Sequence, residues 1–499
     1  MWSLAALLAA ASLSRLVPVS RAQLAAPFDL ISEGPHLCTV QAIARGVNIY
    51  ARQSFLGLPF FMTPYTPLYH VLVAALPQDP ANPFFTGRLV AAAFMVASAA
   101  VLLATARVRR PLAIAAIAAF FLIHAVTGNT VYLRSDAVAL CWSVWAVVAA
   151  SRARSSRGAL AAGVLCGLAL AAKQSFVAAG IACFIHFVRH APRRLRAFFA
   201  GGAAVVLVLA AAATAEWGRD FWLAVTIPVT DYPRDIESFF VHWRMMFAQP
   251  IFLWLVGAAL LAIVTSLRRD RRVAFATPFF PYVLVAWACQ TWVMTGIGAE
   301  NHNLNEPVLA TLLWLVAVED RRGAVLRLGW TRAAALVALA GCVAFELRNP
   351  DPATYAHTDT AKTARYMAAR ERVNAWLRAR SLEHGRMLNL KNSQVVHDYV
   401  GDFVVNDVWM YITVLWNSRP ETVDGLVRAI EREEFDAIFV SPGVLSPEHD
   451  VGNAPWPRII HAVFAHYAVA LRGEEVNVLL RRERSATGPR ARPPQTGGA

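Results

Sequence analysis

Charged residues and cysteines are scarce in this sequence of 499 residues. Asp, Glu, Lys and Arg make up 16% of the chain and hydrophobic residues 57%, whereas soluble domains carry about 25% charged residues. This composition excludes a disordered chain and differs from that of an ordinary soluble enzyme. The six cysteines show no CxxC spacing, and five lie inside apolar runs. The sequence therefore predicts neither a disulfide framework nor a cysteine metal site.

The long apolar runs lie almost entirely within residues 1–346. A helix that crosses a bilayer needs about 20 apolar residues, or fewer when flanking side chains reach the interface. The runs predict eleven spans, at 2–19, 84–106, 111–127, 135–151, 158–174, 175–188, 197–215, 249–267, 273–294, 303–318 and 330–346. We expect the first to be a retained helix rather than a cleaved signal. A further run at 65–76 is too short to cross and predicts a juxtamembrane helix.

The basic residues gather in alternate loops between these spans. Five loops, at 107–110, 152–157, 189–196, 268–272 and 319–327, hold 17 arginines and three acids, which gives 17 − 3 = +14. This sum equals the net charge of the whole chain. Loops rich in arginine stay on the cytoplasmic side, so the excess predicts the orientation in the membrane and not a nucleic-acid partner. The first loop (20–83), the loop 216–248 and the C-terminal segment then lie on the outer side, which would be the periplasmic side if the membrane is a bacterial inner membrane.

Two carboxylates stand in the first outer loop, just after the first span. Asp29 and Glu33 are four residues apart, and Pro35 and Gly46 are typical of the start and end of a helix. An apolar stripe within 35–45 indicates that this helix lies on the membrane surface. The acids are expected near the outer interface, where either could be a general base or an ordinary solvated loop acid.

Other polar groups are predicted at the same face. Arg134 and Asp136 precede the fourth span, the Lys173–Gln174 pair lies between the fifth and sixth, and Arg88 opens the second. Taken singly, each cation needs no ligand, because a long Arg or Lys side chain can extend its charged end to the membrane–water interface. Together they suit a phosphate, because Arg and Lys donate charge-assisted hydrogen bonds to its oxygens. Cations beside a carboxylate at a membrane surface point to a lipid-phosphate substrate.

The C-terminal segment has a different, alternating pattern. Helices are predicted at 360–380, 420–433 and 457–466, and strands at 387–390, 435–440 and 476–481. Such alternation predicts a small soluble α/β domain over 347–483 with a mainly parallel sheet. Residues 484–499, rich in Pro, Gly and Arg, predict a disordered tail.

Five sequence pieces resemble the GT-C integral membrane glycosyltransferases, which use polyprenyl-phosphate sugars. The pieces are Asp29-x-x-x-Glu33-Gly-Pro with Ala44-Arg-Gly46-x-Asn-Ile-Tyr50; Pro64-Tyr65-Thr-Pro67-Leu68-Tyr69 with Gly87-Arg88-Leu89; Arg134-Ser-Asp136; Lys173-Gln174; and Gly298-Ala-x-Asn301-His302. Their order and spacing agree over 1–346. The resemblance implies an α-helical polytopic membrane protein with a GT-C-like domain over 1–346 and the small α/β domain outside.

The same resemblance implies a reaction and its residues. A polyprenyl-phosphate-linked sugar would be the donor, and a glycan, lipid (lipopolysaccharide included) or protein the acceptor, on the periplasmic face. Asp29 is favoured as the general base, with Glu33 as contender. Arg134, Lys173, Arg88 and His302 would hold the donor phosphate, while Tyr65, Tyr69, Asp136, Gln174 and Asn301 would line the cavity. No dedicated ligand cluster is apparent, so we expect no cofactor and no metal requirement.

Two other classes of protein fit the same composition. A transporter or lipid flippase would place charges near the bilayer midplane, often in two matched halves, whereas here the charges gather at the outer ends. A non-catalytic assembly factor of the cell envelope would need no carboxylate in the first loop. The glycosyltransferase hypothesis accounts for more of the polar residues than either.

Overall fold

The structure is a computed structural model of the full chain. It describes residues 2–30, 33–60, 65–106, 110–123, 126, 130–230, 234, 236–269, 277–296, 301–322, 360–391, 399–405, 411, 420–444 and 456–482.

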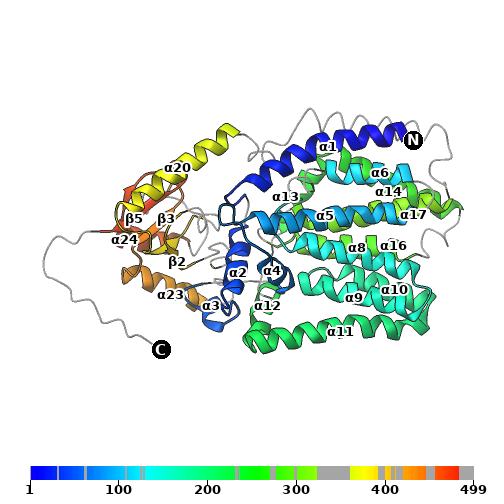
Figure 1. The fold of residues 1–499 in the computed structure, drawn as a ribbon, viewed down its shortest axis with the longest axis horizontal. Helices are drawn as coiled ribbons and strands as arrows, with labels where there is room; N and C mark the ends of the chain where they lie inside the picture. Colours follow the sequence, from blue (N-terminus) through cyan, green and yellow to red (C-terminus); the bar gives the residue numbers. More distant parts are fainter. Residues whose placement is uncertain are drawn as a thin grey trace.

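Ten of the described helices pack side by side into an elongated helical body, on the right of Figure 1. They are α1 (Trp2–Ala25), α5 (Phe85–Thr105), α6 (Arg110–Leu122), α8 (Asp136–Arg152), α9 (Ser156–Ala172), α10 (Ala178–His190), α11 (Pro192–Trp217), α14 (Pro250–Arg269), α16 (Phe279–Val293) and α17 (Asn305–Arg322). Proline stands at the first position of α11, and Gly218, with φ +75°, follows its last residue. Both residues occupy the positions that helix ends favour.

Helices α9 and α11 approach closely because glycines line their contact. A Cβ atom on Gly163 would lie 2.0 Å from the carbonyl oxygen of Phe198, and one on Gly201 would lie 2.2 Å from that of Leu160. No larger side chain fits at either position. Small residues that let two backbones approach are the usual device for packing helices in a bilayer.

These ten helices match ten of the eleven predicted spans, and the eleventh, 330–346, lies outside the described residues. Two helices among the described residues, Phe85–Thr105 and Pro192–Trp217, are long and apolar enough to cross a membrane. Four other apolar helices are shorter. The number of spans therefore stays a prediction.

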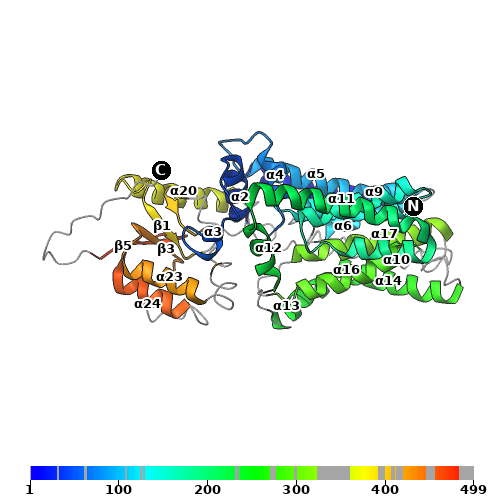
Figure 2. The same cartoon turned by 90° about the horizontal axis from the view of Figure 1, so that it is seen from below.

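Short helices form a layer at one end of the body. They are α2 (Gly34–Ala44), α3 (Arg52–Leu56), α4 (Leu68–Ala74), α12 (Asp220–Thr230) and α13 (Ile236–Phe247). The two helices predicted in the first loop correspond to α2 and α4. Helix α2 runs crosswise to the long helices in both views (Figures 1 and 2). Helices α12 and α13 fill a loop for which the sequence predicted no structure.

A five-stranded sheet domain lies beyond this layer, at the other end of the molecule from the N-terminus (Figure 1). Its strands are β1 (Arg386–Asn389), β2 (Asp402–Phe403), β3 (Ala437–Val440), β4 (Tyr467–Leu471) and β5 (Asn477–Arg481), in the order β2-β1-β3-β5-β4. Its helices are α20 (Thr360–Arg378), α23 (Pro420–Glu431) and α24 (Trp456–His466). The proposed tail and the linker between body and domain lie outside the described residues.

The prediction of a mainly parallel sheet is wrong for two of the four strand pairs. Strand β1 pairs in parallel with β2 and β3, whereas β5 pairs antiparallel with both β3 and β4. Strand β4 follows α24 directly and was missed in the sequence. Only five residues separate β4 from β5, and such a short connection allows only an antiparallel pair.

The sheet domain and the first loop share an apolar core. Phe60 donates its backbone N–H to the carbonyl oxygen of Val404 at 2.6 Å, and its ring meets that of Tyr411 edge-on with centroids 4.7 Å apart. Tyr50 of the same loop and Leu388 of β1 are buried in this core. The first loop is therefore held between the helical body and the sheet domain.

Candidate functional site

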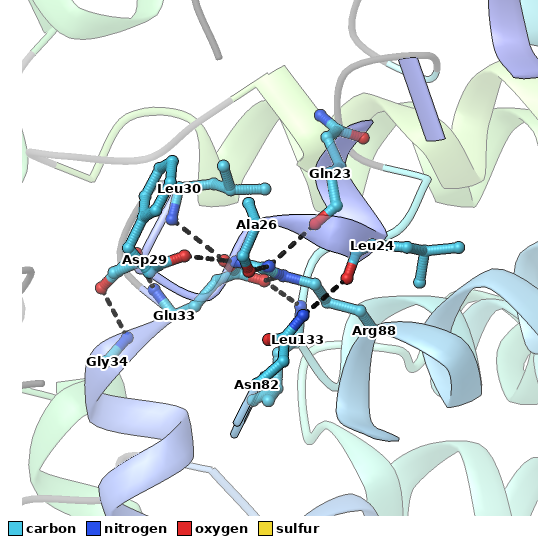
Figure 3. Close-up of polar contacts among 11 residues, drawn as sticks. Gln23, Leu24, Ala26, Asp29, Leu30, Glu33, Gly34, Asn82, Arg88 and Leu133 are labelled. Atoms are coloured by element: carbon cyan, nitrogen blue, oxygen red, sulfur yellow. Dashed lines mark hydrogen bonds and ion pairs between the residues drawn. The ribbon is translucent and has the colours of Figure 1, made fainter. Parts of the chain in front are cut away.

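Asp29 lies four residues before Glu33, the N-cap residue of α2, and its carboxylate accepts hydrogen bonds from the start of that helix. Its Oδ1 accepts the backbone N–H of Glu33 at 3.0 Å, and its Oδ2 accepts that of Gly34 at 2.6 Å (Figure 3). A carboxylate at this position is stabilised by the exposed N–H groups and the dipole of the helix. The residue is 3% exposed. The carboxylate is thus fixed in direction by the first turn of α2.

Glu33 forms a buried ion pair with Arg88 at the start of α5. The guanidinium donates from Nε to Oε1 at 3.0 Å and from Nη2 to Oε2 at 2.5 Å. The backbone N–H groups of Leu133 and Leu30 donate to the same two oxygens, at 2.7 and 3.1 Å. Each oxygen therefore has two donors, which is the number its lone pairs accept. Such a carboxylate is poorly suited to take a proton from a substrate.

Arg88 uses all of its N–H groups within the protein. Besides the two bonds to Glu33, Nη1 donates to the carbonyl oxygens of Gln23 and Ala26, and Nη2 donates to that of Phe28 at 2.7 Å (Figure 3). A guanidinium has five N–H donors, and all five have partners. The phosphate-binding role predicted for Arg88 does not fit this arrangement. The side chain instead fastens the segment that carries Asp29 to helix α5.

A second cluster of charges lies where α8 begins and α9 ends. Lys173 donates from Nζ to Oδ1 of Asp136 at 2.6 Å, and both side chains are largely buried. The ammonium also lies 5.1 Å from the centre of the Tyr65 ring. Gln174 accepts a long hydrogen bond of 3.4 Å from the backbone N–H of Thr66. The four residues predicted for this corner of the site are thus brought together.

The segment 132–134 connects the two clusters. Leu133 donates its N–H to Glu33, and the next residue, Arg134, is 6% exposed. The Arg134 guanidinium lies 5.5 Å from the centre of the Tyr132 ring. Since Leu133 is held by Glu33, the position of Arg134 depends on the same ion pair that fixes the Asp29 segment.

Tyr69 lies between the clusters but does not line an open surface. It is completely buried, and its hydroxyl donates to the carbonyl oxygen of Gly87 at 3.2 Å. Burial, followed by the charges of Glu33 and Asp136, raises its pKa well above the usual value. The residue predicted as cavity lining therefore serves to pack α4 against α5.

The last predicted piece is only partly described. Asn301 and His302 lie in a short 3-10 helix, η1 (Asn301–Leu304), directly before α17, and their side chains lie outside the described part of the structure. Glu306 follows, and the sequence gave no reason to single it out. Its carboxyl group accepts from the Tyr282 hydroxyl at 3.0 Å and from the Gln290 amide at 2.9 Å, which joins α16 to α17.

Two histidines that the sequence analysis did not select stand beside the second cluster. His36 on α2 and His70 on α4 are buried, and their Nδ1 and Nε2 atoms are 2.9 Å apart. Burial lowers the pKa of His70 to about 3. Burial, with His70 and Arg134 next, also lowers the pKa of His36 well below its ordinary value. Both rings are neutral at physiological pH. Both histidines lie on the two short helices predicted in the first loop, and this placement could have identified them from the sequence.

The arrangement combines the Asp29 carboxylate with two buried cations, Arg134 and Lys173, which are linked to its segment through Glu33 and Leu133. Asp29 is suited to accept a proton, whereas Arg134 and Lys173 are suited to stabilise an anion. Among the described residues, no three His, Cys, Asp or Glu side chains gather as metal ligands would.

Comparison with known proteins gives no sequence relative and one informative fold. No protein-family model matches the chain, and no curated protein is detectably similar to it. Among solved structures, ArnT from Cupriavidus metallidurans bound to undecaprenyl phosphate superimposes with a TM-score of 0.57 at 13% sequence identity. The match covers 97% of this chain and 99% of that one. The chain therefore has the fold of ArnT over nearly its whole length, and the predicted fold class, a helical body with a small α/β domain, is confirmed.

Proposed function

We propose that this protein is a membrane-embedded glycosyltransferase that moves a sugar from a polyprenyl-phosphate carrier to an acceptor hydroxyl. One observation carries the proposal. The Asp29 carboxylate and the cations Arg134 and Lys173 gather at one end of the helical body, joined through Glu33 and segment 132–134. ArnT, which has the same fold, was solved with undecaprenyl phosphate bound.

Asp29 is the better candidate for the general base. Glu33 already accepts two hydrogen bonds on each oxygen, so no lone pair is left to receive a proton from the acceptor. Asp29 accepts a hydrogen bond on each oxygen from the N–H groups at the start of α2, and these bonds hold the carboxylate in place. It would take the proton from the acceptor hydroxyl as that oxygen attacks the sugar, with inversion at the anomeric carbon.

Lys173 and Arg134 would stabilise the departing phosphate. Negative charge grows on the leaving oxygen as the sugar approaches an oxocarbenium-like state, and fixed cations in a partly dry site stabilise that charge well. Asp136 takes one of the three N–H donors of Lys173 and holds the ammonium in position. The other two N–H donors could bind a second anion, such as the donor phosphate.

The donor would reach this site through the membrane, so a nucleotide-binding domain is unnecessary. The excess of arginine in alternate loops supports a periplasmic position for the site and for the sheet domain. A periplasmic reporter fused after residue 347 should be active. An inactive fusion at that point would overturn the orientation.

The activity can be tested with the purified full-length protein in lipid vesicles. A panel of radiolabelled hexosyl and pentosyl undecaprenyl phosphates is supplied with candidate glycan, lipid and peptide acceptors, and transfer of label is measured. Asp29→Asn should lower transfer by about 10²–10⁴-fold. The matched control is Asp79→Asn, since Asp79 is an exposed carboxylate of the same loop. Equal transfer by the Asp29 variant and the control would refute the assignment of the base. Movement of label across the bilayer without any transfer would favour a flippase.

A further inference from the structure

The contact between His36 and His70 has the geometry of one N–H···N hydrogen bond between two imidazole rings. Their rings lie within 10° of parallel with centroids 5.2 Å apart, and the 2.9 Å contact joins Nδ1 of His36 to Nε2 of His70. The bond therefore runs from edge to edge, close to the plane of both rings. Two neutral imidazoles carry two N–H groups in total. One must lie between the rings, and the other must be on Nε2 of His36 or on Nδ1 of His70.

The surroundings of His70 decide between these two positions. His70 is completely buried, and its Nδ1 has no hydrogen-bond partner in the described structure. A buried N–H without a partner is rarer and costlier than a buried acceptor without one. The proton is therefore expected between the rings on Nε2 of His70. This arrangement leaves Nδ1 of His36 as the acceptor and puts the remaining proton on Nε2 of His36.

Of the two rings, His36 is the one that keeps some accessible surface. It keeps 8% of its surface accessible, and its Nδ1 is already occupied by His70. The Tyr65 ring lies within 8° of parallel to His36, with centroids 5.4 Å apart, and the same tyrosine receives the Lys173 ammonium. The charges of Arg134, Asp136 and Lys173 all act on His36. The His36 ring therefore lies in the same corner as the two candidate phosphate-binding cations.

Neutrality of the pair follows from this setting. Burial and the neighbouring cations oppose a third positive charge, and Asp136, the acid that favours such a charge on His36, is already paired with Lys173. A neutral imidazole N–H donates to an anionic oxygen without adding to the repulsion among the cations.

We propose that His36 donates its Nε2–H to a phosphate oxygen of the polyprenyl-phosphate ligand, and that His70 is the positioning residue that fixes this tautomer. The inference rests on the proposed function, since it assigns a further contact to the same lipid phosphate. It adds a neutral donor to a site otherwise built from charged groups.

The test measures binding of undecaprenyl phosphate to the purified full-length protein in nanodiscs. His36→Leu removes the donor and should weaken binding by about 10- to 100-fold, which is the usual effect of losing a hydrogen bond to a charged group. His36→Gln keeps an amide N–H near the position of Nε2 and should bind within a few-fold of the unaltered protein. His70→Leu should weaken binding, and His70→Gln, which still offers an N–H to His36, should restore it. If the two histidines only filled space, glutamine would not be expected to restore binding at either position.

Three outcomes separate the possible failures. If the unaltered protein does not bind undecaprenyl phosphate, the proposed function fails along with this inference. If it binds, and Lys173→Met weakens binding while His36→Leu does not, the phosphate site stands and the role of His36 is refuted. If binding strengthens below pH 6.5 in the unaltered protein but not in His36→Gln, His36 binds as a cation and the tautomer assignment is overturned.

Discussion

The ring of Phe28 packs against the ring of Tyr366, with centroids 5.1 Å apart and planes inclined by 50°. Phe28 precedes Asp29, whereas Tyr366 lies on α20 of the sheet domain. Phe28, Leu30 and Tyr132 form one small apolar cluster, against which Tyr366 and Met367 pack. This cluster joins the segment of the candidate base, the segment before Arg134 and the sheet domain. The sheet domain is thus part of the scaffold that positions the site.

Loss of the Tyr366 ring should therefore slow transfer without weakening binding of the lipid phosphate. An aromatic pair contributes about 0.5–1.5 kcal/mol beyond its buried area, so Tyr366→Ala should lower kcat by about three- to ten-fold. Tyr366→Phe should retain full activity. Arg372→Ala is the control on α20, because Arg372 is exposed and pairs only with Glu474 in this structure. An unchanged kcat in Tyr366→Ala would show that the sheet domain does not position the loop.

Arg88 is expected to be required for folding more than for binding. Removing one member of a buried ion pair leaves the other charge unpaired, at a cost of about 3–5 kcal/mol, so Arg88→Met should unfold at a much lower temperature. Arg378→Ala, at an exposed pair with Glu371, should change stability by about 0–1 kcal/mol. Thermal unfolding of the purified protein in detergent measures both. A normal unfolding temperature with lost binding of undecaprenyl phosphate would restore the phosphate role predicted from the sequence.

Lys173 should affect the donor more than the fold. Lys173→Met removes a cation from the proposed phosphate site and should raise KM for the donor by about ten-fold or more. Lys391→Met is a matched control, since this lysine pairs with Glu475 of the sheet domain. Steady-state transfer with varied donor concentration distinguishes the two. Equal KM values in both variants would argue against a phosphate at Lys173.

The sequence was informative where function depends on local pattern. Apolar runs located ten of the described helices, and polar residues at the ends of those runs predicted that Lys173 and Asp136 lie at the same face. It could not assign Arg88, because the partners that use up its five donors lie 55 to 65 residues away in the chain. The His36–His70 contact joins two helices 34 residues apart, and no periodicity encodes such a contact. Strand β4 was missed because it continues directly from α24, without a turn residue to mark the change.

The neutral histidine pair should make stability depend on pH below neutrality. The folded-state pKa of His70 is about 3, while an unfolded histidine titrates near 6.5. Between these values the unfolded chain binds more protons, so the free energy of unfolding falls as the pH is lowered through that window. From pH 6.5 to 5 the loss for His70 alone is about 2 kcal/mol. Thermal unfolding of the full-length protein should show a steeper decline from pH 7 to 5 than the His36→Gln/His70→Gln double variant, in which all carboxylates are retained. Parallel curves would mean that the two rings titrate alike in the folded and unfolded chain, and would contradict a buried, neutral pair.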